Sequence, residues 1–256
     1  MKEIIDQKVQ KGYALDLGKI IEVSFENFKK TFLMSGITLL IAAVVLTFIY
    51  IAYFGILYGF GDFVTTMTEL KSDAINPTMQ MINAAFGVLM VGVMSPLIAG
   101  FINVNHLAKT NQEITINSFF DFYKSPYLKD LILNQIVVGI FTNSIVLFLM
   151  LTNHQFISII LQILIPLFMI FNVPLIIYGE QNYLEAIIKS IRLFIKSPFI
   201  IFVAFLVGAL GSFVGLIALC IGIIFTLPYY FSIVYAIYDQ AIGFKEISVI
   251  DEIGVE

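Results

Sequence analysis

The stretch SIRLFIKSP, from Ser190 to Pro198, decides the fold because similar stretches occur twice earlier in the chain. The sequence SFFDFYKSP occupies positions 118–126, and SFENFKKTF occupies positions 24–32. Aligning the copies superimposes a serine, a phenylalanine four residues later and a lysine six residues later, and the last two copies share a proline. The recurring residues are Ser24, Phe28, Lys30, Ser118, Phe122, Lys124, Pro126, Ser190, Phe194, Lys196 and Pro198. This pattern predicts one structural unit used three times.

The composition around these copies indicates a membrane protein. Hydrophobic residues make up 59% of the 256 positions and charged residues only 12%, with a mean hydropathy of +0.96. Soluble domains carry about 25% charged residues. The apolar residues fall in runs long enough to cross a bilayer. We therefore predict an all-α, polytopic bundle of six transmembrane helices, near 33–58, 80–103, 129–151, 155–178, 198–216 and 218–240.

The basic residues predict the orientation of these spans. All lysines and arginines except Lys71 fall on one side, in the N-terminal segment, in the loops after the second and fourth spans, and in the tail. Cytoplasmic loops of membrane proteins carry such an excess of lysine and arginine. We therefore expect a multi-pass protein of the bacterial inner membrane with both termini in the cytoplasm.

Each copy of the repeated stretch precedes a span on this cytoplasmic side. Around the first and third copies, apolar residues recur at helical spacing and charged residues take the opposite face. The apolar positions are Leu17, Ile20, Ile21, Phe25 and Phe28 in the first copy, and Leu184, Ile187, Ile188, Ile191 and Phe194 in the third. We expect an amphipathic helix at the membrane interface, with its lysine near lipid phosphate. A serine cap and a proline would then start the spanning helix.

The chain accordingly divides into three parallel repeats within a single membrane domain. The units cover about 15–105, 113–180 and 181–242, and a short cytoplasmic tail covers 243–256. Each unit is an interfacial helix followed by a transmembrane hairpin, and each ends in a helix with an internal proline. These span prolines are Pro96, Pro174 and Pro228. Chance similarity among phenylalanine-rich, lysine-flanked segments is the alternative interpretation.

The segments PLIAGF…HLAKTNQEITINSFFDFYK and YLEAIIKSIRLFIKSPF…IGIIFTLPYYFSIVYAIYDQ resemble bacterial six-helix integral membrane proteins of unknown function, related to the membrane domain of glycerophosphodiester phosphodiesterases. The resemblance implies a shared fold and location but no shared reaction, since phosphodiesterase activity in the longer relatives resides in a separate soluble domain. Relatives are also expected to carry the label β-carotene 15,15′-monooxygenase. The residues do not support it: that chemistry resembles an iron site of four histidines, and this chain has two, His106 and His154.

The residue types predict no catalytic site, cofactor or metal. His106 and His154 fall on opposite sides of the predicted bilayer, and no charged residue lies deep in a span, which disfavours an ion-coupled pump. No phosphate-binding glycine loop or nucleophile elbow occurs in the sequence. The basic residues are too few to suggest nucleic-acid binding.

Two functional hypotheses follow, and an intramembrane enzyme ranks third. The first is a non-enzymatic inner-membrane protein that interacts with anionic lipid headgroups on the cytoplasmic face, or that organises a membrane-protein partner or a second copy of itself. The second is a carrier or flippase for an apolar or amphipathic solute. Its path would have a polar lining of Asn134, Gln135 and Asn172, although hydrogen bonds between helices also explain these residues.

Overall fold

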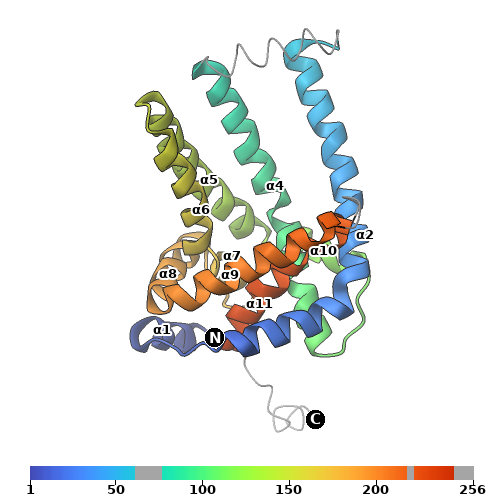
Figure 1. Ribbon diagram of the computed structural model, residues 1–256, viewed down its shortest axis with the longest axis vertical. Helices are drawn as coiled ribbons and strands as arrows, with labels where there is room; N and C mark the ends of the chain where they lie inside the picture. Colours follow the sequence, from blue (N-terminus) through green and yellow to red (C-terminus); the bar gives the residue numbers. More distant parts are fainter. Residues whose placement is uncertain (61–76, 218–221, 245–256) are drawn as a thin grey trace.

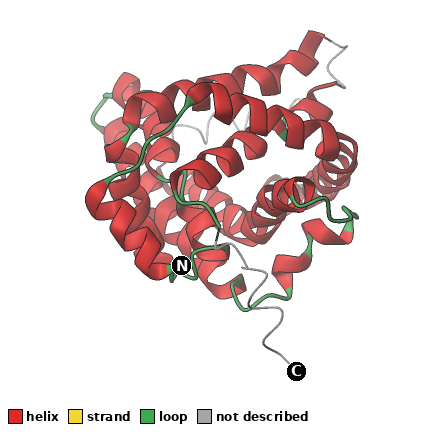
Figure 2. Ribbon diagram, turned by 90° about the horizontal axis from the view of Figure 1, so that it is seen from below, coloured by secondary structure: helices red, strands yellow, loops and turns green. Residues whose placement is uncertain are grey.

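The computed structural model describes residues 1–60, 77–217 and 222–244, and within these ranges it is helical with no strand (Figures 1 and 2). The α-helices are α1 (Lys2–Lys11), α2 (Leu17–Tyr58), α4 (Pro77–Lys109), α5 (Leu128–Leu151), α6 (Gln155–Phe168), α7 (Asn172–Ile177), α8 (Tyr183–Lys196), α9 (Pro198–Phe213), α10 (Gly222–Thr226) and α11 (Tyr229–Ala241). Three short 3-10 helices are η1 (Asn117–Phe119), η2 (Asp121–Tyr123) and η3 (Val214–Ile217). The predicted outer loop with Lys71 and the tail after Phe244 lie outside the described residues.

Five of the described helical stretches are long and apolar enough to cross a membrane. They cover 17–58, 78–109, 128–151, 155–177 and 198–217, and they correspond to the first five predicted spans. Within the described residues, the prediction of an all-α protein with helices long and apolar enough to span a membrane is confirmed. The predicted sixth span, 218–240, is not one continuous helix: it contains α10 and α11, with a break at Leu227 and Pro228.

Helix α2 passes without a break through the first copy of the repeated stretch, so the predicted helix end at this copy is wrong. Its 42 residues extend over about 63 Å at 1.5 Å per residue, roughly twice the hydrocarbon thickness of a bilayer. In Figure 1 the N-terminal part of α2 lies along the lower end of the molecule, which we call the base, and the remainder rises up one side. Helices bend at glycine and serine pairs, and α2 contains Ser35–Gly36. Helix α2 therefore changes direction by bending and not by ending.

The face that α2 buries is largely polar. Its buried residues recur at helical spacing and are mostly small: Ile20, Ser24, Asn27, Thr31, Ser35, Gly36, Thr38 and Ala42. The exposed face carries large apolar side chains, including Phe25, Phe32 and Phe48. Small residues allow helices to approach closely inside a membrane, whereas large apolar residues suit contact with lipid. The apolar stripe predicted for the first copy is therefore split, because Ile20 is buried and Phe25 is exposed.

The other two copies differ from each other in local structure. The second copy forms η1 and η2 instead of an α-helix. The third forms α8, and α9 then begins at Pro198 as predicted. The predicted serine cap is wrong there, because the Ser197 side chain makes no capping hydrogen bond. In the second copy the hydroxyl of Ser125 accepts a hydrogen bond from the Tyr127 N–H over 3.3 Å.

The three span prolines are buried, but they occupy different places in their helices. Pro96 lies inside the continuous helix α4, whereas Pro174 lies near the start of α7 and Pro228 directly precedes α11. Proline lacks an N–H and clashes with the carbonyl four residues earlier. The chain is accordingly interrupted before Pro174, between α6 and α7, and before Pro228, between α10 and α11.

The hydrophobic core lies toward the base of the molecule. Helices α7 and α11 are almost wholly buried there, and Leu175, Ile233 and Tyr235 are fully inaccessible. From this base α4, α5, α6 and the remainder of α2 rise, while α9 crosses the base obliquely (Figure 1). The backbone of η1 rests directly on α4, since a Cβ atom at Gly100 would overlap the carbonyl oxygen of Phe119. The base thus positions the lower ends of the rising helices.

Candidate functional site

The serine and phenylalanine of the repeated stretch occupy the same kind of environment in all three copies. Ser24, Ser118 and Ser190 are all buried. The hydroxyl of Ser190 donates to the Phe168 carbonyl over 2.7 Å and accepts from the Phe171 N–H over 3.1 Å, which holds α8 at the break between α6 and α7. The phenylalanines all contact the main core: Phe122 and Phe194 belong to it, and Phe28 packs against it. The copies therefore share side-chain environments although their backbones differ.

The three lysines are exposed, and two of them bind the ends of neighbouring helices. The Lys30 ammonium donates to the Ala108 carbonyl over 2.9 Å and to the Asn111 side-chain oxygen over 2.8 Å, at the C-terminal end of α4. Lys196 donates to the Gln10 carbonyl over 3.0 Å, at the C-terminal end of α1. A cation stabilises the unpaired carbonyls of a helix C-terminus. Among described residues, the Lys124 side chain has no hydrogen-bond or ion-pair partner.

Helix α8 presents three different faces. One face packs on the protein through Ala186, Ser190, Leu193 and Phe194. A second face is apolar and exposed: Leu184, Ile188 and Ile195, which are 49%, 50% and 60% exposed, lie at spacings of four and seven residues along one side. Charged side chains form the third face: Glu185, Lys189, Arg192 and Lys196. The helix begins with a cap, because the Asn182 side chain accepts hydrogen bonds from the N–H groups of Leu184 and Glu185.

Two of the three residues predicted to line a polar path instead join helices. Asn134 of α5 and Asn172 of α7 are buried, and the Asn172 amide donates to the Asn134 side-chain oxygen over 3.1 Å. Asn134 also donates to the Tyr183 carbonyl over 3.0 Å, at the start of α8. Neither asparagine is among the residues that line the cavity between α4, α5, α6 and α11. Interhelical hydrogen bonding accounts for them.

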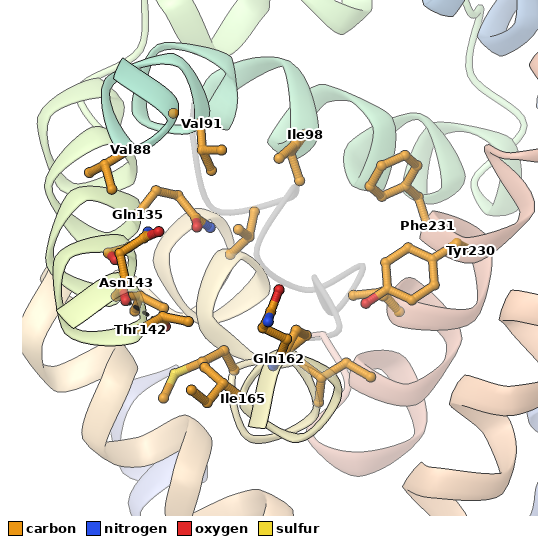
Figure 3. A pocket seen from close by; sticks show the side chains of 18 of the residues that line it. Val88, Val91, Ile98, Gln135, Thr142, Asn143, Gln162, Ile165, Tyr230 and Phe231 are labelled. Carbon is orange, nitrogen blue, oxygen red and sulfur yellow. Dashed lines mark hydrogen bonds between the residues drawn. The ribbon is translucent and has the colours of Figure 1, made fainter. Parts of the chain in front are cut away.

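Gln135, the third of these residues, lines a partly open cavity of about 470 Å³ between α4, α5, α6 and α11 (Figure 3). Most of its lining is apolar, and the polar side chains include Gln135, Thr142 and Asn143 from α5 and Gln162 from α6. No Asp, Glu, His, Lys or Arg occurs among the described residues that line it. Thr142 and Asn143 follow Gln135 by seven and eight residues, which places all three on one side of α5. Helical spacing could therefore have predicted that they line the same cavity.

The polar groups of the cavity are only partly used by the protein. The amide of Asn143 donates to the Gly139 carbonyl over 2.8 Å, and the amide of Gln162 donates to the Ser158 carbonyl over 3.3 Å. These bonds stay within each helix and leave the side-chain oxygens of both residues available. Within the described part of the chain, the Gln135 amide makes no hydrogen bond. The cavity thus offers both hydrogen-bond acceptors and amide N–H donors in an apolar surround, since each of these side-chain amides carries two N–H groups.

A cluster of aromatic rings closes the base where α4, α7 and α11 meet. The ring of Phe244 lies 4.2 Å from that of His106 and 4.9 Å from that of Tyr178, measured between centroids. The His106 Nδ1 atom is 3.1 Å from the Tyr235 hydroxyl oxygen. Among the described residues, no group of three or more histidine, cysteine or acidic side chains is placed to hold a metal ion. The cluster packs the helix ends together.

Comparison with protein-family models, with curated proteins and with solved structures finds no match to this chain.

Proposed function

We propose that this protein is a non-enzymatic membrane protein that binds lipid at one surface of the bilayer, with α8 lying in the interface. The three faces of α8 are the main observation that supports this proposal. A helix that packs on protein along one face, exposes Leu184, Ile188 and Ile195 along a second, and carries Arg192 and Lys196 on a third, suits the boundary between acyl chains and headgroups. The apolar face meets hydrocarbon and the basic residues meet anionic headgroups.

The finer architecture belongs to the same proposal. Three Ser–Phe–Lys segments with buried serines, core-packed phenylalanines and exposed lysines support three parallel units. Each unit would contribute two spans, the sixth being the interrupted pair α10 and α11. The one-sided distribution of lysine and arginine supports a bacterial inner membrane with both termini in the cytoplasm. On this view each segment marks the corner at which the chain leaves the interface.

The position of α8 can be tested with fluorescent labels in reconstituted bilayers. In a Cys220→Ser background, a label at Ile188→Cys should be quenched by spin-labelled acyl chains, and a label at Arg192→Cys by aqueous iodide. These residues lie four positions apart on the same helix, so they control for each other. Quenching of both labels by iodide alone would place α8 in water. Quenching of both by acyl chains alone would place it inside the bilayer. Either result overturns the proposal.

The preference for anionic lipid has its own test. Arg192→Glu combined with Lys124→Glu reverses two exposed cations whose side chains have no ion-pair partner within the described ranges. We expect this variant to retain less phosphatidylglycerol in native mass spectrometry. Lys2→Glu with Lys11→Glu makes the same charge change on α1, whose apolar residues Ile5 and Val9 pack on the core, and this variant should retain as much as the wild type. Equal retention by all three proteins would reject the lipid preference.

A further inference from the structure

We infer that the cavity between α4, α5, α6 and α11 is a binding site for an uncharged, hydroxyl-bearing lipid, of which monoacylglycerol is the simplest form. The inference goes beyond the interfacial role of α8, because none of the cavity lining belongs to α8. Three observations support this inference: the position of the cavity, the lack of charged residues in its described lining, and the unused hydrogen-bonding groups of its polar side chains.

The position of the cavity indicates how a ligand would reach it. Gly87, Val91 and Ile98 of α4 line it, as do Gln135 of α5 and Gln162 of α6, and all five lie in stretches able to span a membrane. The cavity is partly open, and helices in these stretches expose many apolar side chains. Its volume of about 470 Å³ is within the range of roughly 300–1,000 Å³ that is usual for ligand sites. A molecule dissolved in the bilayer is therefore the natural occupant.

The absence of charge in the lining selects against ionic lipids. Phosphate, carboxylate or ammonium groups would lose their hydration in this cavity and find no described partner of opposite charge. Burying an ion without a partner of opposite charge is strongly unfavourable. Apolar side chains such as Val88, Ile98 and Ile165 suit an acyl chain instead (Figure 3). The occupant is thus an uncharged molecule with a long apolar part.

The unused acceptors select for a hydroxyl group. Asn143 and Gln162 each direct an amide N–H to a backbone carbonyl of their own helix, which leaves their side-chain oxygens free to accept. Gln135 projects into the same cavity from α5 (Figure 3). A ligand hydroxyl can donate to these oxygens and can also accept from the remaining amide N–H groups, whereas an ester can only accept and an alkane does neither. A buried acceptor that is left without a donor is unfavourable, so a hydroxyl-bearing lipid is favoured over a lipid that lacks a hydroxyl group.

The test uses the full chain in nanodiscs with three photoactivatable probes of equal chain length: a monoacylglycerol, a fatty acid methyl ester and a lysophosphatidylglycerol. We expect the monoacylglycerol to label peptides of α4, α5 and α6 most strongly. Gly87→Leu should lower this labelling about tenfold, since a Cβ atom at Gly87 meets nothing within 4 Å and the leucine fills open space. Ala85→Leu is the matched control, because Ala85 lines a second cavity between α4 and α5 and not this one.

A second pair of variants tests the chemistry of recognition. Asn143→Leu with Gln162→Leu removes two of the three amide acceptors and should reduce the preference for monoacylglycerol over methyl ester. Val91→Phe blocks the same cavity independently of Gly87→Leu. Wild-type labelling in both blocked variants would show that the lipid binds elsewhere. Equal labelling of the wild type by lysophosphatidylglycerol would overturn the uncharged class, and an unchanged preference without the two acceptors would overturn hydroxyl recognition.

Discussion

The side-chain amide of Asn172 donates a hydrogen bond to the side-chain oxygen of Asn134 over 3.1 Å, and both residues are buried. Asn134 in turn donates to the carbonyl of Tyr183, and the Tyr183 N–H donates to the carboxylate of Asp130 over 3.1 Å. Two residues of α5 thereby hold the start of α8, and one residue of α7 joins them. The interfacial helix is fixed to the bundle by these polar contacts.

Asn134→Leu is expected to lower the thermal unfolding midpoint in detergent. The substitution leaves the Asn172 amide and the Tyr183 carbonyl without their partner, at a cost of about 1–2 kcal/mol. Gln135→Leu is the matched control. The Gln135 amide has no hydrogen-bond partner among the described residues, so this substitution should leave the unfolding midpoint nearly unchanged. A cycle with Asn172→Leu measures the pair directly. Additive effects of the two asparagine substitutions would mean that the bond does not stabilise the fold.

Tyr13→Phe is expected to destabilise the protein at neutral pH and to matter less at alkaline pH. The Tyr13 hydroxyl donates to the Leu193 carbonyl over 2.7 Å, and burial raises the pKa of this phenol above its ordinary value. The unfolded chain ionises near pH 10 while the folded chain keeps its proton, so the contribution is present below pH 10 and is lost as pH rises further. Chemical unfolding of both proteins from pH 7 to 11 checks this. A constant difference throughout would contradict it.

Exchanging the charges of Lys109 and Asp239 should restore the stability that a single charge reversal removes. The Lys109 ammonium lies 2.6 Å from an Asp239 carboxylate oxygen and joins the C-terminal ends of α4 and α11. Because Lys109 is 45% exposed, solvent weakens the pair, and Lys109→Glu should cost about 0.5–1 kcal/mol. Lys109→Glu with Asp239→Lys should regain most of that stability, with a smaller effect in high salt. No recovery in the double variant would show that the pair contributes little.

Gly100→Ala and Gly87→Ala should have opposite effects although both lie in α4. A Cβ atom at Gly100 overlaps the Phe119 carbonyl oxygen, so η1 must move, at a cost of about 1–3 kcal/mol. A Cβ atom at Gly87 meets nothing within 4 Å, and alanine favours helix over glycine by about 1 kcal/mol. Unfolding midpoints of the two variants provide the comparison. Equal effects would mean that η1 does not rest on α4 as described.

The class of the fold and the long helices could be predicted because both depend on uninterrupted apolar runs within single segments. The predicted spans 129–151 and 155–178 agree closely with the observed stretches 128–151 and 155–177. The continuity of α2 was missed although a signal existed: the first copy reads KKTF and lacks the proline of the other two. The 3-10 turns of the second copy depend on the contact between Phe119 and Gly100, which no local pattern records.

The candidate site could be predicted only in part, because it depends on how helices are rotated. Asn134 and Gln135 are adjacent in the sequence, yet about 100° of helical rotation turns one toward α7 and α8 and the other toward the cavity. The partners of Lys30 and Lys196 lie 78 and 186 residues away along the chain. Sequence spacing showed that these lysines recur and predicted that they are exposed. It could not predict which helix ends they bind.

The small hydroxyl-bearing face of α2 affects the order in which the protein can be assembled during synthesis. Ser24 of α2 lies 3.3 Å from the Tyr229 hydroxyl, contributed by a residue that is translated 205 positions later. At about 5–20 residues per second, the ribosome needs roughly 10–40 s to reach it. Throughout that interval Ser24 of α2 lacks this contact with Tyr229. The contact between α2 and α11 therefore forms only after most of the described chain has been synthesised.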